Sequence, residues 1–141
     1  MISYRRGLRG RAERGSMAIE LVLLVPVLVA VMLLVIGAGR FIDRQGDVEA
    51  AAREAARAAS YERDYGSAQA AAQHAATQSL PSGLSCSPVD LSGTDFSAGG
   101  MIRVRVTCRA DLSELGFSGL PGSVQLSGDS AAPLDQWRRT S

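Results

Sequence analysis

Residues 15–40 read GSMAIELVLLVPVLVAVMLLVIGAGR, and the organisation of the whole chain follows from this stretch. No charged side chain occurs between Leu21 and Gly39. At a helical rise of about 1.5 Å per residue, this run is roughly 28 Å long, which is close to the thickness of the hydrocarbon core of a bilayer. The sequence therefore predicts a transmembrane helix at residues 16–39.

A basic segment precedes the apolar run. Residues 1–14 contain five arginines and one glutamate, a net charge of +4, whereas the rest of the chain contains ten arginines and thirteen acidic residues, a net charge of −3. Because basic flanks stay on the cytoplasmic side, we expect a cytoplasmic N-terminus and an extracytoplasmic C-terminal domain. Residues 1–15 are interpreted as a basic leader or cytoplasmic tail, and residues 1–14 are expected to lack regular structure. Tyr4 is its only aromatic residue, so nucleic acid is not an expected partner.

The size and composition argue against an enzyme. The chain has 141 residues, and only seven of them are aromatic, which leaves room for one small domain beside the membrane helix. His74 is the only histidine and has no Asp, Glu or Cys close in sequence. No serine lies in a nucleophile-elbow sequence, and the cysteine spacing is not that of a zinc site. We therefore expect no catalytic residues, no cofactor and no metal site.

Residues 40–80 have a helical, alanine-rich pattern. A stripe of small apolar residues follows one face of this helix: Val48, Ala52, Ala55 and Ala59. Two interpretations stay open, because such a stripe either packs against neighbouring helices or belongs to a solvated helix. Gly66 is a candidate breakpoint, and Ser67 is then the expected N-cap of a second helical part that ends near Leu80.

The composition changes in residues 81–141, where Gly, Ser, Pro and Asp become frequent. Residues 101–110 read MIRVRVTCRA and predict the clearest strand, with Ile102, Val104, Val106 and Cys108 on one face. Shorter strands are expected near residues 86–91 and 123–131. Four residues of the intervening loop are expected to cover the apolar face: Leu112, Leu115, Phe117 and Leu120. The predicted fold class is α+β, with a small antiparallel sheet of about three strands packed on the long helix.

Cys86 and Cys108 both follow the apolar run. In an exported domain they would lie in an oxidising compartment, where a pair of cysteines is expected to be bridged. The closed loop would contribute roughly 3 kcal/mol of stability in the chain-entropy model. Val89 and Leu91 alternate out of step with Cys86, so either Pro88 shifts the alternation or the bridge lies at the edge of the sheet.

Glu20 lies at the front edge of the apolar run. A carboxylate facing lipid costs a few kcal/mol, so Glu20 is either hydrated at headgroup level or paired with a cation. No arginine of its own helix is well placed, whereas a free α-amine would serve. Gly15 is the only glycine in the chain that is followed by a glutamate five positions later.

The order of basic leader, Gly15, Glu20 and apolar helix resembles the class III signal peptide of type IV pilins and pseudopilins. In that family a prepilin peptidase cuts after the glycine. The resemblance implies that the mature chain begins at Ser16 and that Glu20 neutralises the N-terminal amine of an adjacent subunit. Ser16 replaces the Phe that favours N-methylation in other type IV pilins.

The resemblance is more specific in two segments, RGSMAIELVLLVPVL at residues 14–28 and AAREAARAAS at residues 51–60. They are similar to the TadE family of the Tad (Flp) pilus system, and TadF relatives of similar size fit equally well. The resemblance implies a single-pass minor pilin or pseudopilin in the bacterial inner membrane, with a role in pilus assembly and adhesion. Its implied partners are other Tad pilins, the pilus assembly platform and the prepilin peptidase.

Two other interpretations stay open at this stage. The chain could be an unprocessed bitopic protein that is anchored in the envelope and binds another molecule there. It could also be a secreted protein cut near Ala38, although the apolar run is longer than the core of about 7 to 15 residues found in secretory signals.

Overall fold

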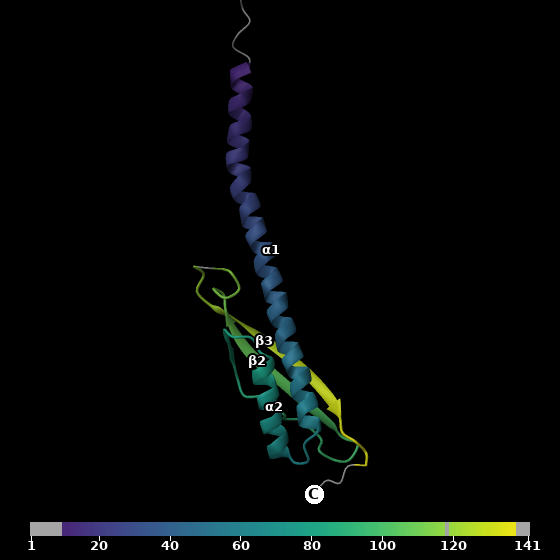
Figure 1. Cartoon of the computed structure of the whole chain (residues 1–141). Coiled ribbons are helices and arrows are strands. Elements are labelled where there is room, and N and C mark those ends of the chain that lie inside the picture. The colour runs from purple at the N-terminus through teal and green to yellow at the C-terminus, as the bar shows by residue number, and fades with distance from the viewer. Residues whose placement is uncertain (1–9, 118, 138–141) are drawn as a thin grey trace, which may run out of the picture. The chain divides into compact units, whose positions relative to one another are not determined.

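The computed structural model describes residues 10–117 and 119–137, with side chains from Ile19 onward. Its elements, in chain order, are α1 (Gly10–Ser60), α2 (Tyr65–Ser79), β1 (Leu84–Cys86), β2 (Met101–Asp111) and β3 (Ser123–Pro133) (Figure 1). The strands form one antiparallel sheet in the order β1-β2-β3. The predicted α+β class, a long apolar N-terminal helix followed by a small three-stranded sheet, is confirmed. Two compact units, Met1–Ile36 and Gly37–Ser141, are described separately below.

α1 is a continuous helix that passes through Pro26 without ending. The prediction that residues 1–14 lack regular structure was wrong for residues 10–14, which belong to α1. Residues 1–9 lie outside the described part of the chain. Extending an existing helix costs far less than nucleating one, and Ala12, Glu13 and the neighbouring arginines are good helix formers. The helix therefore grows backwards past the predicted boundary.

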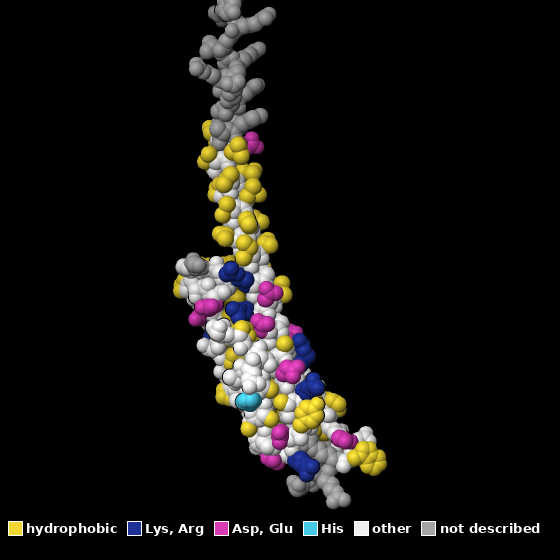
Figure 2. Space-filling view, in the orientation of Figure 1, with side chains coloured by type: hydrophobic (Ala, Val, Ile, Leu, Met, Phe, Trp, Pro, Cys, Tyr) yellow, Lys and Arg dark blue, Asp and Glu magenta, His cyan; other side chains and the backbone are white. Residues whose placement is uncertain are grey.

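In the first unit, the described side chains of α1 are all exposed. Figure 2 shows hydrophobic side chains over the visible face of this segment, and every leucine, valine and isoleucine from Ile19 to Ile36 is exposed. By its length and composition, α1 is a candidate membrane-spanning helix. A helix that is apolar on all sides has no water-facing side, so it needs lipid or protein around it.

In the second unit, α1, α2 and the sheet share one hydrophobic core. The stripe of Val48, Ala52, Ala55 and Ala59 is fully buried in this core, together with Ala68, Ala72 and Ala76 of α2 and the inner face of β2. The interpretation as a solvated helix was therefore wrong, whereas the expected close approach of another helix is found within the chain itself, where α2 shares this core. Small side chains allow a close approach, and the chain's own sheet and second helix use it.

Gly128 shows how close that approach is. A Cβ atom at Gly128 would lie 2.9 Å from the Cα atom of Glu49, so only glycine fits where β3 meets α1. Beside this contact, the Gln45 side chain donates a hydrogen bond from Nε2 to the carbonyl oxygen of Ser127, at 2.8 Å. The backbone of β3 is thus held against α1 by packing and by a hydrogen bond.

α1 ends at Ser60, and the N-cap of α2 is Asp64 rather than the predicted Ser67. Asp64 has an extended backbone, and its Oδ1 accepts a hydrogen bond from the Ser67 N–H at 2.9 Å. The Ser67 hydroxyl donates to Asp64 Oδ2 at 2.7 Å. Hydrogen bonds from the Ser67 side chain and backbone lower the pKa of Asp64. α2 ends at Ser79, with Leu80 as its C-cap, close to the predicted end.

β2 has the predicted alternation, with Ile102, Val104, Val106 and Cys108 buried. The predicted strand at residues 86–91 is instead the short edge strand β1, followed by an isolated pairing of Asp90 with Arg105. Cys86 pairs with Cys108, so the edge segment has one residue more than β2 between these two pairings. This extra residue, in the stretch that contains Pro88, places Val89 and Leu91 on the buried face.

The loop before β3 covers the core only in part. Leu115 is buried and Phe117 is partly buried, but Leu120 is 59% exposed, so its predicted role in covering the sheet was wrong. Leu120 lies in a turn, where its N–H donates to the Phe117 carbonyl oxygen at 3.1 Å. Beyond β3, Leu134 is buried and Trp137 is exposed.

Candidate functional site

The residues predicted for processing lie inside α1. Gly15 and Ser16 are both helical, and the side chains there are outside the described part of the structure. Glu20 follows Ser16 by four residues, so about one helical turn, or roughly 6 Å along the axis, separates them. The Glu20 side chain is exposed between the exposed Ile19 and Leu21. A carboxylate in this position is available to a cation supplied by a neighbouring molecule.

Cys86 and Cys108 are joined by a disulfide bond and lie directly opposite each other in β1 and β2. Cys108 is fully buried, whereas Cys86 is exposed at the edge strand. The bond closes a loop with a sequence separation of 22 residues. It therefore ties a three-residue edge strand, which would be marginal by itself, to the centre of the sheet.

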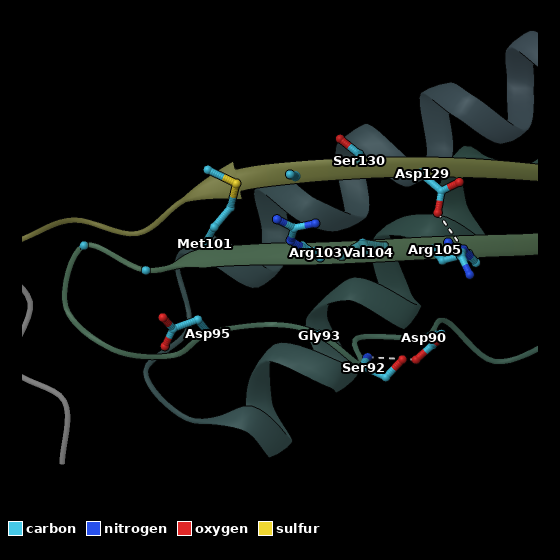
Figure 3. A pocket seen from close by; sticks show the side chains of 13 residues that line it. Asp90, Ser92, Gly93, Asp95, Met101, Arg103, Val104, Arg105, Asp129 and Ser130 are labelled. Carbon is cyan, nitrogen blue, oxygen red and sulfur yellow. Dashed lines mark hydrogen bonds and ion pairs between the residues drawn. The ribbon is translucent and has the colours of Figure 1, made fainter.

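The outer face of the sheet carries a polar groove between β2, β3 and the loop after β1 (Figure 3). Arg105 and Asp129 lie toward one end of it. The Nε atom of Arg105 donates to Asp129 Oδ1 at 2.6 Å, and the Arg105 backbone exchanges two hydrogen bonds with Asp90, at 2.9 and 3.0 Å. The Asp129 carboxylate raises the pKa of the Arg105 guanidinium by accepting its hydrogen bond. The groove thus has an exposed ion pair at this end.

The other acidic groups of the groove hold the shape of the loop. Asp90 Oδ1 accepts a hydrogen bond from the Ser92 N–H at 2.8 Å, and Asp95 Oδ1 accepts one from the Ser97 N–H at 3.0 Å. These backbone hydrogen bonds lower the pKa of both aspartates. Within residues 10–117 and 119–137, no group of three or more His, Cys, Asp or Glu residues is arranged to hold a metal ion.

The sequence did not reveal two close contacts that involve glycines and helix α1. Gly128 lies against α1, as described above, and Gly37 of α1 lies against the ring of Phe117. A glycine inside a strand or helix pattern is the available signal for such a contact, since its missing side chain lets another group approach.

Comparison with protein families gives a match that begins at Gly15. Residues 15–57 match the family model of TadE-like proteins. The resemblance to the TadE family is therefore confirmed over the apolar run and most of the buried alanine stripe. A match to TadE-like proteins over this segment suggests a membrane protein associated with a Tad pilus. The single apolar helix near the N-terminus agrees with membrane anchoring.

Comparisons with curated proteins and with solved structures found no match. The TadE-like segment ends within α1, before α2 and the sheet begin.

Proposed function

We propose that this protein is a minor pilin or pseudopilin that takes part in the assembly of a Tad-type pilus after a prepilin peptidase cleaves it behind Gly15. The observation that carries the proposal is that three features fall together at residues 15–20. The TadE-like match, the Gly15-to-Glu20 spacing and the junction between the basic segment and the apolar run all fall there.

Gly15 suits the role of a cleavage position. A peptidase needs an extended peptide in its active site, and this segment is helical in the intact chain. Glycine is about 1 kcal/mol less favourable in a helix than alanine, so local unwinding costs least at this residue. The lack of a side chain also lets the peptidase approach the bond between Gly15 and Ser16.

Cleavage would create the cation that Glu20 lacks. The new α-amine of Ser16 carries a positive charge, and an ammonium beside a carboxylate lowers the cost of holding either charge at the edge of the membrane. In a filament, the amine of one subunit would pair with Glu20 of its neighbour and set the register between their helices.

The proposed topology follows the charge pattern. Residues 1–15 form the cytoplasmic leader, residues 16–39 cross the inner membrane, and the extracytoplasmic part consists of the alanine-rich segment 40–80 and the disulfide-bonded domain 81–141. Other Tad pilins and the assembly platform are the proposed partners. The exposed domain is then the part available for capping, priming or adhesion.

The N-terminus of the protein tests the proposal directly. Intact mass and N-terminal peptide mapping are applied to protein from cells with a complete Tad system. We expect a chain that starts at Ser16. Gly15→Leu is expected to leave the leader attached. Gly39→Leu is the matched control, because Gly39 is a helical glycine with no atom within 4 Å of an added Cβ, and this variant is expected to be processed normally.

Two results would replace the proposal. A chain that keeps Met1 in the presence of active peptidase would be an unprocessed bitopic protein. A start near Gly39, abolished by Gly39→Leu, would identify a secreted protein, and Glu20 would then belong to a discarded signal.

A further inference from the structure

Residues 112–117 and 119–122, here named the proximal loop, contact α1 at Gly37 and Arg40, where the uncharged run ends. Gly37 is buried although its neighbours Ile36 and Ala38 are exposed. A Cβ atom at Gly37 would overlap the ring of Phe117, so this ring covers the glycine. A Cβ atom at Gly116 would lie 2.7 Å from Nη1 of Arg40. Gly37 and Arg40 are three residues apart and share one face of the helix.

These contacts place the proximal loop beside Gly37 and Arg40 of α1. Gly37 lies three residues before Arg40, the first charged residue after the run, which corresponds to about 4.5 Å along the helix axis. Phe117 therefore contacts α1 within the uncharged segment. A helix that spans a bilayer with this segment would hold the proximal loop at the membrane surface.

Two apolar side chains that lie close in sequence to these contact residues are exposed. Leu120 of the proximal loop is 59% exposed, and Ile42, half a turn beyond Arg40, is 67% exposed. The acidic residue of the loop is turned elsewhere, since a Cβ atom at Gly83 would lie 3.2 Å from Oε2 of Glu114, near the start of β1. Leu120 is thus an exposed leucine in the turn that follows Phe117.

We propose that the proximal loop is a second membrane contact, which inserts Leu120 into the lipid interface beside the point where α1 leaves the bilayer. The occupant is lipid because Gly37, which the Phe117 ring covers, itself belongs to the uncharged run of a helix that is long and apolar enough to cross a membrane. Phe117 positions the loop by packing on Gly37. This contact would hold the folded domain against the membrane until the subunit is extracted. The proposal depends on α1 spanning the membrane and is independent of cleavage at Gly15.

Tryptophan fluorescence in lipid nanodiscs tests this contact with the full-length chain. Leu120→Trp is combined with Trp137→Phe, and the lipids carry a nitroxide quencher either near the headgroup or near the end of the acyl chain. We expect the headgroup-proximal quencher to remove most of the fluorescence of Trp at position 120 and the chain-end quencher to remove little. Gly37→Val, which displaces the Phe117 ring, should largely abolish the quenching.

Two controls separate this proposal from membrane anchoring itself. Trp137 of the unmodified chain is 91% exposed at the far end of the sequence and should stay unquenched. Leu28→Trp with Trp137→Phe places the probe near the middle of the apolar run, where the chain-end quencher should act more strongly. If position 28 is quenched and position 120 is not, the loop contact is wrong and the anchor stands. If neither is quenched, the anchor is wrong and the loop contact is lost with it.

One further outcome would overturn the proposal, and a second probe position covers a failure of Leu120→Trp to fold. A blue shift at position 120 that depends on the protein-to-lipid ratio, without quenching by lipid, would overturn the proposal and assign the surface to a second copy of the chain. If Leu120→Trp disturbs folding, Pro121→Trp is the replacement probe, and the same quenching pattern is expected there because Pro121 is exposed in the same loop.

Discussion

The two parts of α1 differ in whether their apolar side chains are exposed or buried by the rest of the chain. Up to Ile36 the helix is apolar on every side and all of its described side chains are exposed, for example Val22 at 71%. After Gly37 it is apolar along one stripe only, and that stripe is fully buried, for example Ala52 at 0%. Large side chains mark the part that needs an external partner. Small side chains mark the part that the chain covers itself.

This difference separates anchoring from folding. Substitutions in the first part are expected to change contacts with lipid or with other subunits, while the second unit keeps its stability. Substitutions in the second part are expected to change the stability of the domain, while the anchor is retained. Each prediction below tests one side of this separation.

The largest effect is expected from loss of the disulfide bond. Cys86→Ala with Cys108→Ala should lower the free energy of unfolding of the second unit by about 3 kcal/mol, because the unfolded chain regains the freedom of the closed loop. Urea denaturation followed by circular dichroism measures the change, and reduction of the unmodified chain is the control. Equal unfolding midpoints with and without the bond would show that other contacts already hold the edge strand.

The next prediction compares the effect on Tm of an Ala→Leu substitution in each of the two parts of α1. Ala55→Leu adds bulk at a fully buried position and should cost about 2 to 3 kcal/mol, or roughly 10 to 20 °C in the Tm of the domain. Ala30→Leu makes the same change at an exposed position of the apolar run and should leave that Tm unchanged. Thermal unfolding in nanodiscs, followed by circular dichroism, gives both values. Similar losses of Tm in the two variants would contradict the separation.

A smaller, pH-dependent effect is expected at Asp64. The pKa of Asp64 is lowered by hydrogen bonds from Ser67, so the folded form is stabilised above the ordinary pKa of Asp and loses this stabilisation as the pH falls through the lowered value. Asp64→Ala should lower the Tm by a few degrees at neutral pH, and the difference should shrink below the ordinary Asp value of about 3.9. Asp64→Asn is the matched control, since it keeps a capping oxygen without this titration. A difference that does not depend on pH would show that the charge of Asp64 is unimportant.

Much of the fold was predictable because its signals are local. The apolar run needs only length and composition, and the strand at Met101–Asp111 needs only alternation. The small antiparallel sheet was predicted from the small number of strands and from the presence of a helix that could cover them. The candidate processing residues Gly15, Ser16 and Glu20 also rest on local spacing, and their roles remain predictions.

The remaining features depend on what lies across space. A stripe of alanines has the same pattern whether it meets another subunit or the chain's own sheet, so the partner of Ala52 was not predictable. Asp64 and Ser67 are both good N-caps, and the choice depended on where α1 ended. Leu120 is apolar like Leu115, and only the turn of the loop determines which of them faces the core.

The bond between Cys86 and Cys108 has a mechanical consequence. If the protein is built into a filament, as proposed, a load on its exposed domain would put the chain under tension. If the sheet yields, the bond removes the 22 residue steps between the cysteines from the length that can be pulled out. At about 3.4 Å per extended residue, this withholds roughly 70 Å of contour length from each subunit. The crosslink therefore limits how far the protein extends under force, even after its sheet has been lost.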